Sequence, residues 1–157
     1  MTRESVPQQI VPQEAVIREA QTREDFWKVL VVRGIVFMEE QKIGWAEEID
    51  QHEDSCTHFL GEVDGQPVVV GRLRALPGGE WKLERVAVRR AWRGQGLARR
   101  MVQAMLAAAA ERGAKRLRLH AQVYLADFYA SFGFRTEGGI FQECGIDHVL
   151  MIREGSP

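Results

Sequence analysis

The stretch from residue 81 to residue 111 constrains the fold of this 157-residue chain more than any other part of the sequence. Residues 81–88 are expected to form a strand, and two glycines, Gly94 and Gly96, follow after a short connector. From Gly96 the apolar side chains recur with the period of a helix, in a stripe formed by Leu97, Met101, Met105 and Ala108. A strand, a glycine-rich turn and an amphipathic helix in this order predict an α/β domain.

Shorter elements are expected on both sides of this unit. Strands are expected at residues 16–20, 58–63, 67–73, 116–122 and 149–152, and helices at 23–38 and 125–132. Thr22 stands where a helix N-cap is expected, and Asp64-Gly65 is a hairpin turn signal. The resulting order, β-α-β-β-β-α-β-α-β, predicts an α/β fold with a mixed, mostly antiparallel sheet. Residues 44–56 are expected to form a long loop.

Composition excludes several classes of protein. The chain has 21 basic and 22 acidic residues, and therefore no surplus of cations for nucleic acid. No apolar run approaches the roughly 20 residues that span a bilayer, and the first residues show no hydrophobic core of the signal-peptide kind. We expect a disordered N-terminal tail at residues 1–13 and a single domain at 14–157. Together these features predict a cytoplasmic protein with no nucleic-acid or membrane partner.

The glycine-rich turn before the amphipathic helix is suited to an anion. Glycines let backbone N–H groups approach a ligand closely, and a helix N-terminus adds free donors and the positive end of its dipole. Arg93 and Arg99 can add charged contacts. A dinucleotide fingerprint would need glycine or alanine at position 99, and a P-loop would need Gly-Lys-Ser/Thr. The turn therefore predicts a phosphate or pyrophosphate site, and the simpler alternative is a tight turn before a core helix.

Four segments carry a resemblance to a known family. They are Val36-Phe37-Met38-Glu39-Glu40-Gln41, Arg93-Gly94-Gln95-Gly96-Leu97-Ala98, Ala121-Gln122 with Phe128-Tyr129-Ala130-Ser131-Phe132-Gly133-Phe134, and Gly145-Ile146-Asp147-His148. The second fits Q/R-x-x-G-x-G/A, the acetyl-CoA signature of the GNAT superfamily of N-acetyltransferases. The first and last resemble the small bacterial ElaA-like or YjcF-like branch. The similarity covers residues 16–153.

This resemblance implies a fold, a cosubstrate and an activity. In a GNAT-like fold, strand 81–88 splays away from strand 116–122, and acetyl-CoA enters the gap and leaves as CoA. The implied activity is transfer of an acetyl group to a primary amine of a small molecule or protein, by direct attack on the thioester. A catalytically silent CoA-binding sensor is the alternative. The residues that the resemblance assigns to acetyl-CoA are Val86, Ala87, Val88, Arg93, Gly94, Gln95, Gly96, Leu97, Ala98, Arg99, Gln122 and Tyr129.

Such a transfer needs a base and an acid. An amine with a pKa near 10.4 is only about one part in a thousand neutral at pH 7.4, so a group must accept its proton. Glu84, two residues before Val86, is the predicted base, with His120, His148 or a water as alternatives. A backbone N–H near Val86 can stabilise the charge on the thioester oxygen. Tyr129 is predicted to protonate the leaving thiolate, although it also stands among phenylalanines that predict a packing role.

Other ionisable groups carry weaker hypotheses. An acidic segment could attract a cationic amine or could form a solvated loop; it contains Glu47, Glu48, Asp50, Glu53 and Asp54. No metal site is predicted, because the spacing of the nearby ligating residues matches no zinc pattern; these are His52, Asp54, Cys56 and His58. One anion site also explains the arginines of residues 89–100 without a nucleic acid. The expected partner is the amine substrate, and a homodimer is an open alternative to a monomer.

Overall fold

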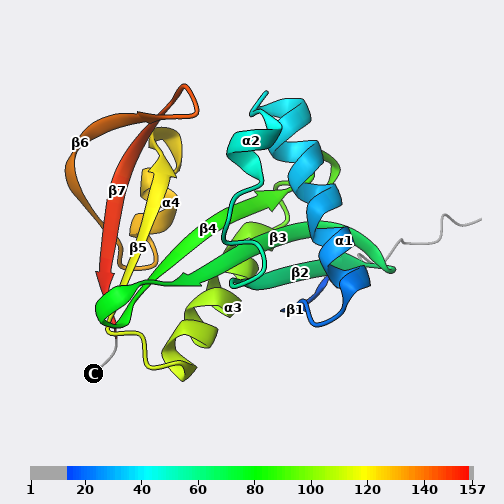
Figure 1. Cartoon of the computed structure of the whole chain (residues 1–157), viewed down its shortest axis with the longest axis horizontal. Coiled ribbons are helices and arrows are strands. Elements are labelled where there is room, and N and C mark those ends of the chain that lie inside the picture. The colour runs from blue at the N-terminus through cyan, green and yellow to red at the C-terminus, as the bar shows by residue number, and fades with distance from the viewer. Residues whose placement is uncertain (1–13, 156–157) are drawn as a thin grey trace, which may run out of the picture.

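A computed structural model describes residues 14–155, so the predicted N-terminal tail lies outside the described residues. The strands form one seven-stranded sheet in the order β1-β2-β3-β4-β5-β7-β6, in which only β4 and β5 are parallel neighbours (Figure 1). The strands are β1 (Val16–Glu19), β2 (Thr57–Val63), β3 (Gln66–Ala75), β4 (Glu80–Val88), β5 (Arg116–Gln122), β6 (Arg135–Glu143) and β7 (Ile146–Glu154). The prediction of a mixed, mostly antiparallel sheet is confirmed.

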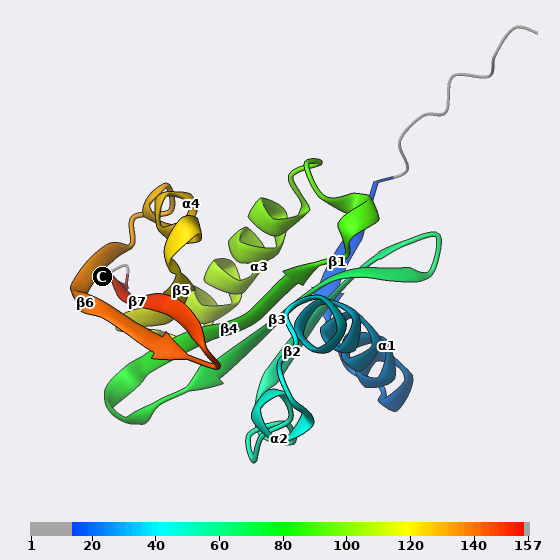
Figure 2. The ribbon, with the colours of Figure 1, turned by 90° about the horizontal axis from the view of Figure 1, so that it is seen from above.

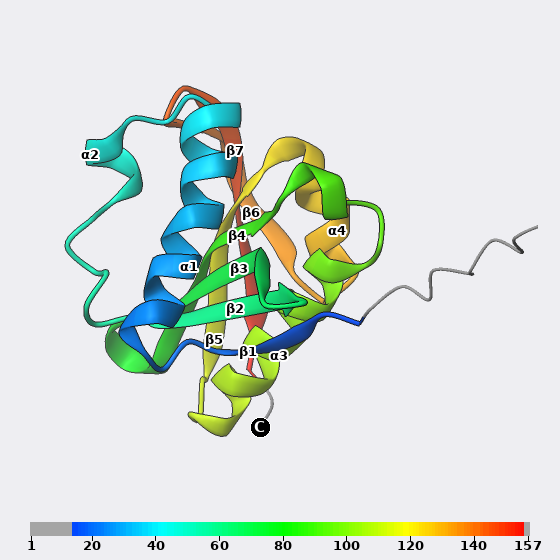
Figure 3. The ribbon, with the colours of Figure 1, turned by 90° about the vertical axis from the view of Figure 1, so that its right-hand side faces the viewer.

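Helices cover both faces of this sheet, as Figure 2 and Figure 3 show. One face carries α1 (Arg23–Arg33) and α2 (Trp45–Glu48), and the other carries α3 (Leu97–Glu111) and α4 (Ala126–Ala130). The predicted stripe of α3 is buried in the core beneath it, with Met101 and Met105 fully enclosed. A second, smaller core lies between α1 and the sheet, around Val29 and Val32. The apolar periodicity of α3 therefore identified its buried side correctly.

The first helix is longer than α1 alone. Thr22 caps its N-terminus, accepting a hydrogen bond from the backbone N–H of Asp25, whose side chain accepts in return from the Thr22 N–H. After Arg33 the helix continues as a π-helix, η1 (Gly34–Glu40). The predicted helix at residues 23–38 thus covers two consecutive helical segments. Such π segments are rare and often occur at functional sites.

Two elements differ from the expectations. The sequence does not predict β6, because most of its side chains are exposed and its only partner is β7, so it lacks an alternating apolar face. It contains Gly138 and Gly139, which disfavour a strand. The expected loop at 44–56 contains α2 at its start and a series of turns after it.

The parallel strands β4 and β5 separate halfway along their length. Their pairing runs only from Glu80–Arg116 to Leu83–Leu119, while β5 continues beside β7 as far as Gln122. On the other side of β4, the register with β3 shifts around Arg85, a non-glycine residue with a φ of 56°. Such a bulge bends a strand locally. Beyond it, β4 and β5 diverge and leave a gap in the middle of the sheet (Figure 1).

Candidate active site

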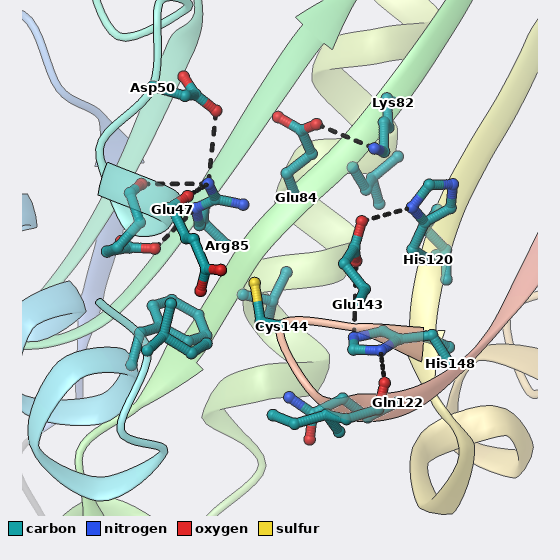
Figure 4. A pocket seen from close by; sticks show the side chains of 18 of the residues that line it. Glu47, Asp50, Lys82, Glu84, Arg85, His120, Gln122, Glu143, Cys144 and His148 are labelled. Carbon is teal, nitrogen blue, oxygen red and sulfur yellow. Dashed lines mark hydrogen bonds and ion pairs between the residues drawn. The ribbon is translucent and has the colours of Figure 1, made fainter. Parts of the chain in front are cut away.

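A cavity of about 350 Å³ lies at this gap. Its walls come from β3, β4, β5, α4, the turn between β6 and β7, the end of η1, and α2 with the segment after it. Four residues predicted for the site line it: Glu84, Val86, Gln122 and Tyr129. The two histidines considered as alternative bases, His120 and His148, line it as well. The fold therefore gathers the predicted catalytic groups around one space (Figure 4).

The glycine-rich turn has the backbone that an anion site requires. Gly94 and Gly96 have φ values of 78° and 79°, in the left-handed region that L side chains rarely adopt. A Cβ at either position would meet no other atom within 4 Å, so the space beside the turn is open. Gly96 is the N-cap of α3, and the first N–H groups of this helix, at Leu97 and Ala98, have no intrahelical acceptor. This backbone can accommodate a phosphate.

Two arginines flank this turn and are held by the protein. Arg93 donates from Nε to the carbonyl of Val88 at 2.8 Å and from Nη2 to Glu40 at 2.7 Å. Arg99 donates from Nη2 to the Ser131 hydroxyl at 3.0 Å, and its guanidinium lies 4.7 Å from the centre of the Phe132 ring. Both side chains are thereby positioned beside the turn and keep further N–H groups for a ligand.

The end of β4 is not paired with β5 at the gap, although the carbonyl of Val88 accepts the hydrogen bond from Arg93. Val86 and Val88 pack toward the core beneath α3, whereas Ala87 packs toward the core beneath α1. Within residues 14–155, β5 pairs with no residue of β4 beyond Leu83. An extended ligand can therefore bind along this edge by main-chain hydrogen bonds. On the opposite wall, the side-chain amide of Gln122 donates to Gln41 at the end of η1, at 3.0 Å.

Tyr129 packs in the hydrophobic core and also lines the cavity. The residue is 7% exposed, and its ring contacts Phe128 and Phe134 edge-to-face, with centroids 5.0 and 6.3 Å apart. Burial raises the pKa of its hydroxyl above the usual value of 10. The phenol is protonated at neutral pH, and burial makes it a weaker acid than an exposed phenol.

Glu84 is bound by three cations, which corrects the expectation that it is free to accept a proton. Its carboxylate lies 2.5 Å from Arg72, 2.8 Å from Arg74 and 3.3 Å from Lys82. Burial disfavours its charge, but the hydrogen bond from Arg74 and the charges of Arg72 and Lys82 outweigh burial and lower its pKa to about 2. A carboxylate with this pKa is a weak base.

A different carboxylate, Glu143, contacts both histidines of the cavity (Figure 4). Its Oε1 lies 3.1 Å from Nδ1 of His120, and its Oε2 lies 3.6 Å from Nε2 of His148. The hydrogen bond from His120 is the largest cause of a lowered pKa at Glu143. Glu143 ends the strand β6, which the sequence does not predict, and was not among the expected site residues. Its position two residues before Gly145-Ile146-Asp147-His148 was the available signal.

Comparisons with known proteins identify the family. The family described as "Acetyltransferase (GNAT) domain" matches residues 17–154.

The chain is a member of the GNAT acetyltransferase family.

Similar proteins agree with this assignment and with the predicted branch. YyaT of Bacillus subtilis, an uncharacterized protein, is 35% identical over 85% of this chain and 91% of its own. The uncharacterized N-acetyltransferase YjcF of the same organism is 33% identical over 86% and 96%. Among solved structures, Escherichia coli ElaA has a TM-score of 0.79 and 25% identity over 90% of this chain and 99% of its own. This GNAT protein is therefore an acyltransferase.

Three carboxylates of the acidic segment, Glu48, Asp50 and Glu53, belong to an ion-pair network and are not free to attract an amine, whereas Glu47 and Asp54 are exposed as in a solvated loop. Glu48 is 2% exposed and lies 2.5 Å from Arg33 and 2.9 Å from Arg85. Asp50 lies 2.7 Å from Arg72. The remaining contacts join Glu53 to Arg33 and Arg72, and Arg85 to Asp50. The sequence could not show this neutralisation, because these arginines come from α1, β3 and β4.

The described part of the chain adds two further facts about this GNAT member. Residues 14–155 contain no group of three or more His, Cys, Asp or Glu side chains that could hold a metal ion. His58, one of the residues considered for metal binding, instead contacts the carbonyl of Glu53 at 2.8 Å through Nε2. No helix in the same range is long and apolar enough to cross a membrane.

Proposed function

We propose that this acyltransferase is an acetyl-CoA-dependent N-acetyltransferase that acts on a primary amine of a small molecule or protein by direct attack on the thioester. The observation that carries this proposal is the gap between β4 and β5, where the cavity contains a Glu143–His120 pair and Tyr129. The glycine-rich turn adjoins the same gap, because it links the end of β4 to the start of α3.

Acetyl-CoA fits the residues around the gap. The open, left-handed glycines and the N-terminus of α3 would hold the pyrophosphate, and the free edge of β4 at residues 86–88 would pair with the pantetheine arm. The residues on the pyrophosphate side are Arg93, Gly94, Gln95, Gly96, Leu97, Ala98 and Arg99. When bound, acetyl-CoA supplies the activated acyl group, and a backbone N–H of β4 near Val86 stabilises negative charge on the acyl oxygen.

His120 is the base in this proposal, and Glu143 positions it. Glu143 accepts the hydrogen bond of Nδ1–H, so in the neutral imidazole Nε2 carries the free lone pair that can accept the amine proton. The carboxylate then stabilises the imidazolium that forms. His148 donates from Nδ1 to the carbonyl of Ile146 at 2.7 Å, which turns its Nε2 toward Glu143. Glu84 forms salt bridges with the arginines of β3 and is not the base in this proposal.

Tyr129 supplies the proton that the leaving sulfur requires. Its hydroxyl is protonated at neutral pH, and because burial raises its pKa, it gives up the proton only to a sulfur on which negative charge has developed. Tyr129 lines the same cavity as His120, so His120 can accept the proton of the amine while Tyr129 donates one to the sulfur.

The test is an assay in which the protein is mixed with acetyl-CoA and each of a panel of primary amines. A thiol-reactive reagent detects the CoA that is released. We expect thiol release that depends on the amine and saturates with both substrates. A catalytically silent CoA sensor would instead show thermal stabilisation by CoA without turnover of any amine. In that case the catalytic proposal is wrong, although CoA binding stands.

A further inference from the structure

Three cations lie side by side across the middle of the sheet, just before β4 and β5 separate. Arg74 of β3 is the register partner of Lys82 of β4, and Lys82 is in turn the partner of Arg118 of β5. We name these three residues the cation row. Like charges directly opposite one another on neighbouring strands are destabilising. The arrangement therefore needs either full compensation by carboxylates or a ligand.

Among the described residues, two carboxylates form salt bridges with the cation row. Glu84 lies 2.8 Å from Arg74 and 3.3 Å from Lys82, and Glu80 lies 3.1 Å from Arg118. Two carboxylates thus face three cations, and Glu84 is also shared with Arg72 at 2.5 Å. Glu143 is a third carboxylate near the row, because the charge of Lys82 contributes to its lowered pKa, but no salt bridge joins the two side chains.

Free N–H groups of the cation row border the cavity. Arg74 and Lys82 both line it, with side chains 20% and 15% exposed. Arg74 uses Nε and Nη2 on Glu84. In the described range, residues 14–155, Nη1 of Arg74 has no protein partner, and Lys82 has only the contact with Glu84. A guanidinium and an ammonium with free N–H groups form a suitable site for a compact oxyanion.

The position of His120 indicates where the amine would lie. His120 follows Arg118 by two residues on β5, so both side chains are on the same face of the strand, about 6.6 Å apart along it. Figure 4 shows Lys82, His120 and Glu143 around the same space. A substrate that reaches from the cation row to His120 carries its anionic group several bonds from its amine.

We propose that the acceptor is an amine bearing a compact oxyanion, a carboxylate or a phosphate, which Arg74 and Lys82 bind while His120 faces the amine. This proposal rests on the N-acetyltransferase activity proposed above and narrows its acceptor.

The first experiment compares three amines of equal chain length in the CoA-release assay: 6-aminohexanoate, 6-aminohexyl phosphate and hexylamine. We expect kcat/KM for at least one of the two anionic amines to exceed that for hexylamine by about tenfold or more. The preferred anion tells a carboxylate site from a phosphate site. Equal or better use of hexylamine overturns the oxyanion site but leaves the acetyltransferase intact. No CoA release with any amine contradicts the acetyltransferase itself.

The second experiment tests whether the cation row causes the preference for an anionic amine over hexylamine. Lys82→Met and Arg74→Gln are expected to lower the ratio of kcat/KM for the preferred anionic amine to that for hexylamine by about tenfold. The ratio is the readout because a general loss of folding or of base strength affects both amines alike. The matched control is Arg135→Gln, which removes an exposed cation of β6 outside the cavity and should leave the ratio unchanged. An unchanged ratio in both cavity variants overturns the proposal.

Discussion

At the residue scale, the hydrogen bond between His120 and Glu143 makes a prediction about pH. A protonated imidazole cannot accept a proton, so kcat/KM of the wild type should fall as the pH is lowered through the pKa of the base. His120→Ala should lower kcat/KM about 100-fold or more and abolish this acidic limb. A pH profile of kcat/KM, measured with the amine well below its KM, shows both effects.

Glu143→Gln and Glu84→Gln are the comparisons for this profile. Glu143→Gln removes the carboxylate that orients His120 and stabilises the imidazolium formed in the reaction, so kcat/KM should fall across the pH range. Glu84→Gln should retain the limb of the wild type, because its carboxylate is bound to Arg72, Arg74 and Lys82. Loss of the limb in Glu84→Gln alone would restore Glu84 as the base.

Also at the residue scale, Tyr129 makes a separate prediction. Tyr129→Phe keeps the ring between Phe128 and Phe134 but removes the O–H that can protonate sulfur. We expect turnover to fall about tenfold or more, while the dissociation constant of acetyl-CoA is preserved. Steady-state kinetics together with calorimetric titration of acetyl-CoA separate the two quantities. Full turnover by this variant would assign Tyr129 to packing alone.

At the scale of elements, the glycine turn before α3 can be tested against the other end of the same helix. Gly96 and Gly113 both have positive φ values, 79° and 72°, and a Cβ at either would meet no atom within 4 Å. Substitution by alanine should therefore lower the free energy of unfolding by a similar amount at both sites, on the order of 1 kcal/mol. Only Gly96→Ala should also weaken binding of acetyl-CoA, which isothermal titration measures. Equal affinities in the two variants would contradict a phosphate site at the turn.

The same elements show what the sequence could predict. The stripe of α3, the turn before it and the cap at Thr22 depend on residues close together in the chain, so local periodicity and turn chemistry identified them. Glu143 and β6 depend instead on pairing with β7 and on side chains brought together from other strands. The resemblance to GNAT proteins placed Tyr129 and Gln122 at the cavity, but local patterns do not specify which carboxylates the arginines neutralise.

At the scale of the whole molecule, the sheet separates two kinds of interior. The side under α3 and α4 is an apolar core that includes Met101 and Tyr129, whereas the side under α1 and α2 holds the buried ion pairs of Arg33 and Arg72. The cavity lies where the two sides meet at the gap between β4 and β5. The nearly equal numbers of acidic and basic residues thus include a set of internal ion pairs beside the site.

These ion pairs make the stability of the whole fold depend on pH. The three cations around Glu84 lower its pKa from 4.5 to about 2 in the folded chain. The unfolded chain therefore takes up this proton at a higher pH, so the stability due to the ionised carboxylate is present above about pH 4.5 and is lost as the pH falls through about 2. The corresponding free energy is roughly 3 kcal/mol. Urea unfolding at several pH values in this range should show the decline, and Glu84→Gln should flatten it. Glu111 is exposed on α3, so the stability of Glu111→Gln should decline with falling pH as that of the wild type does. An equal decline in the stability of Glu84→Gln would contradict the role of Glu84.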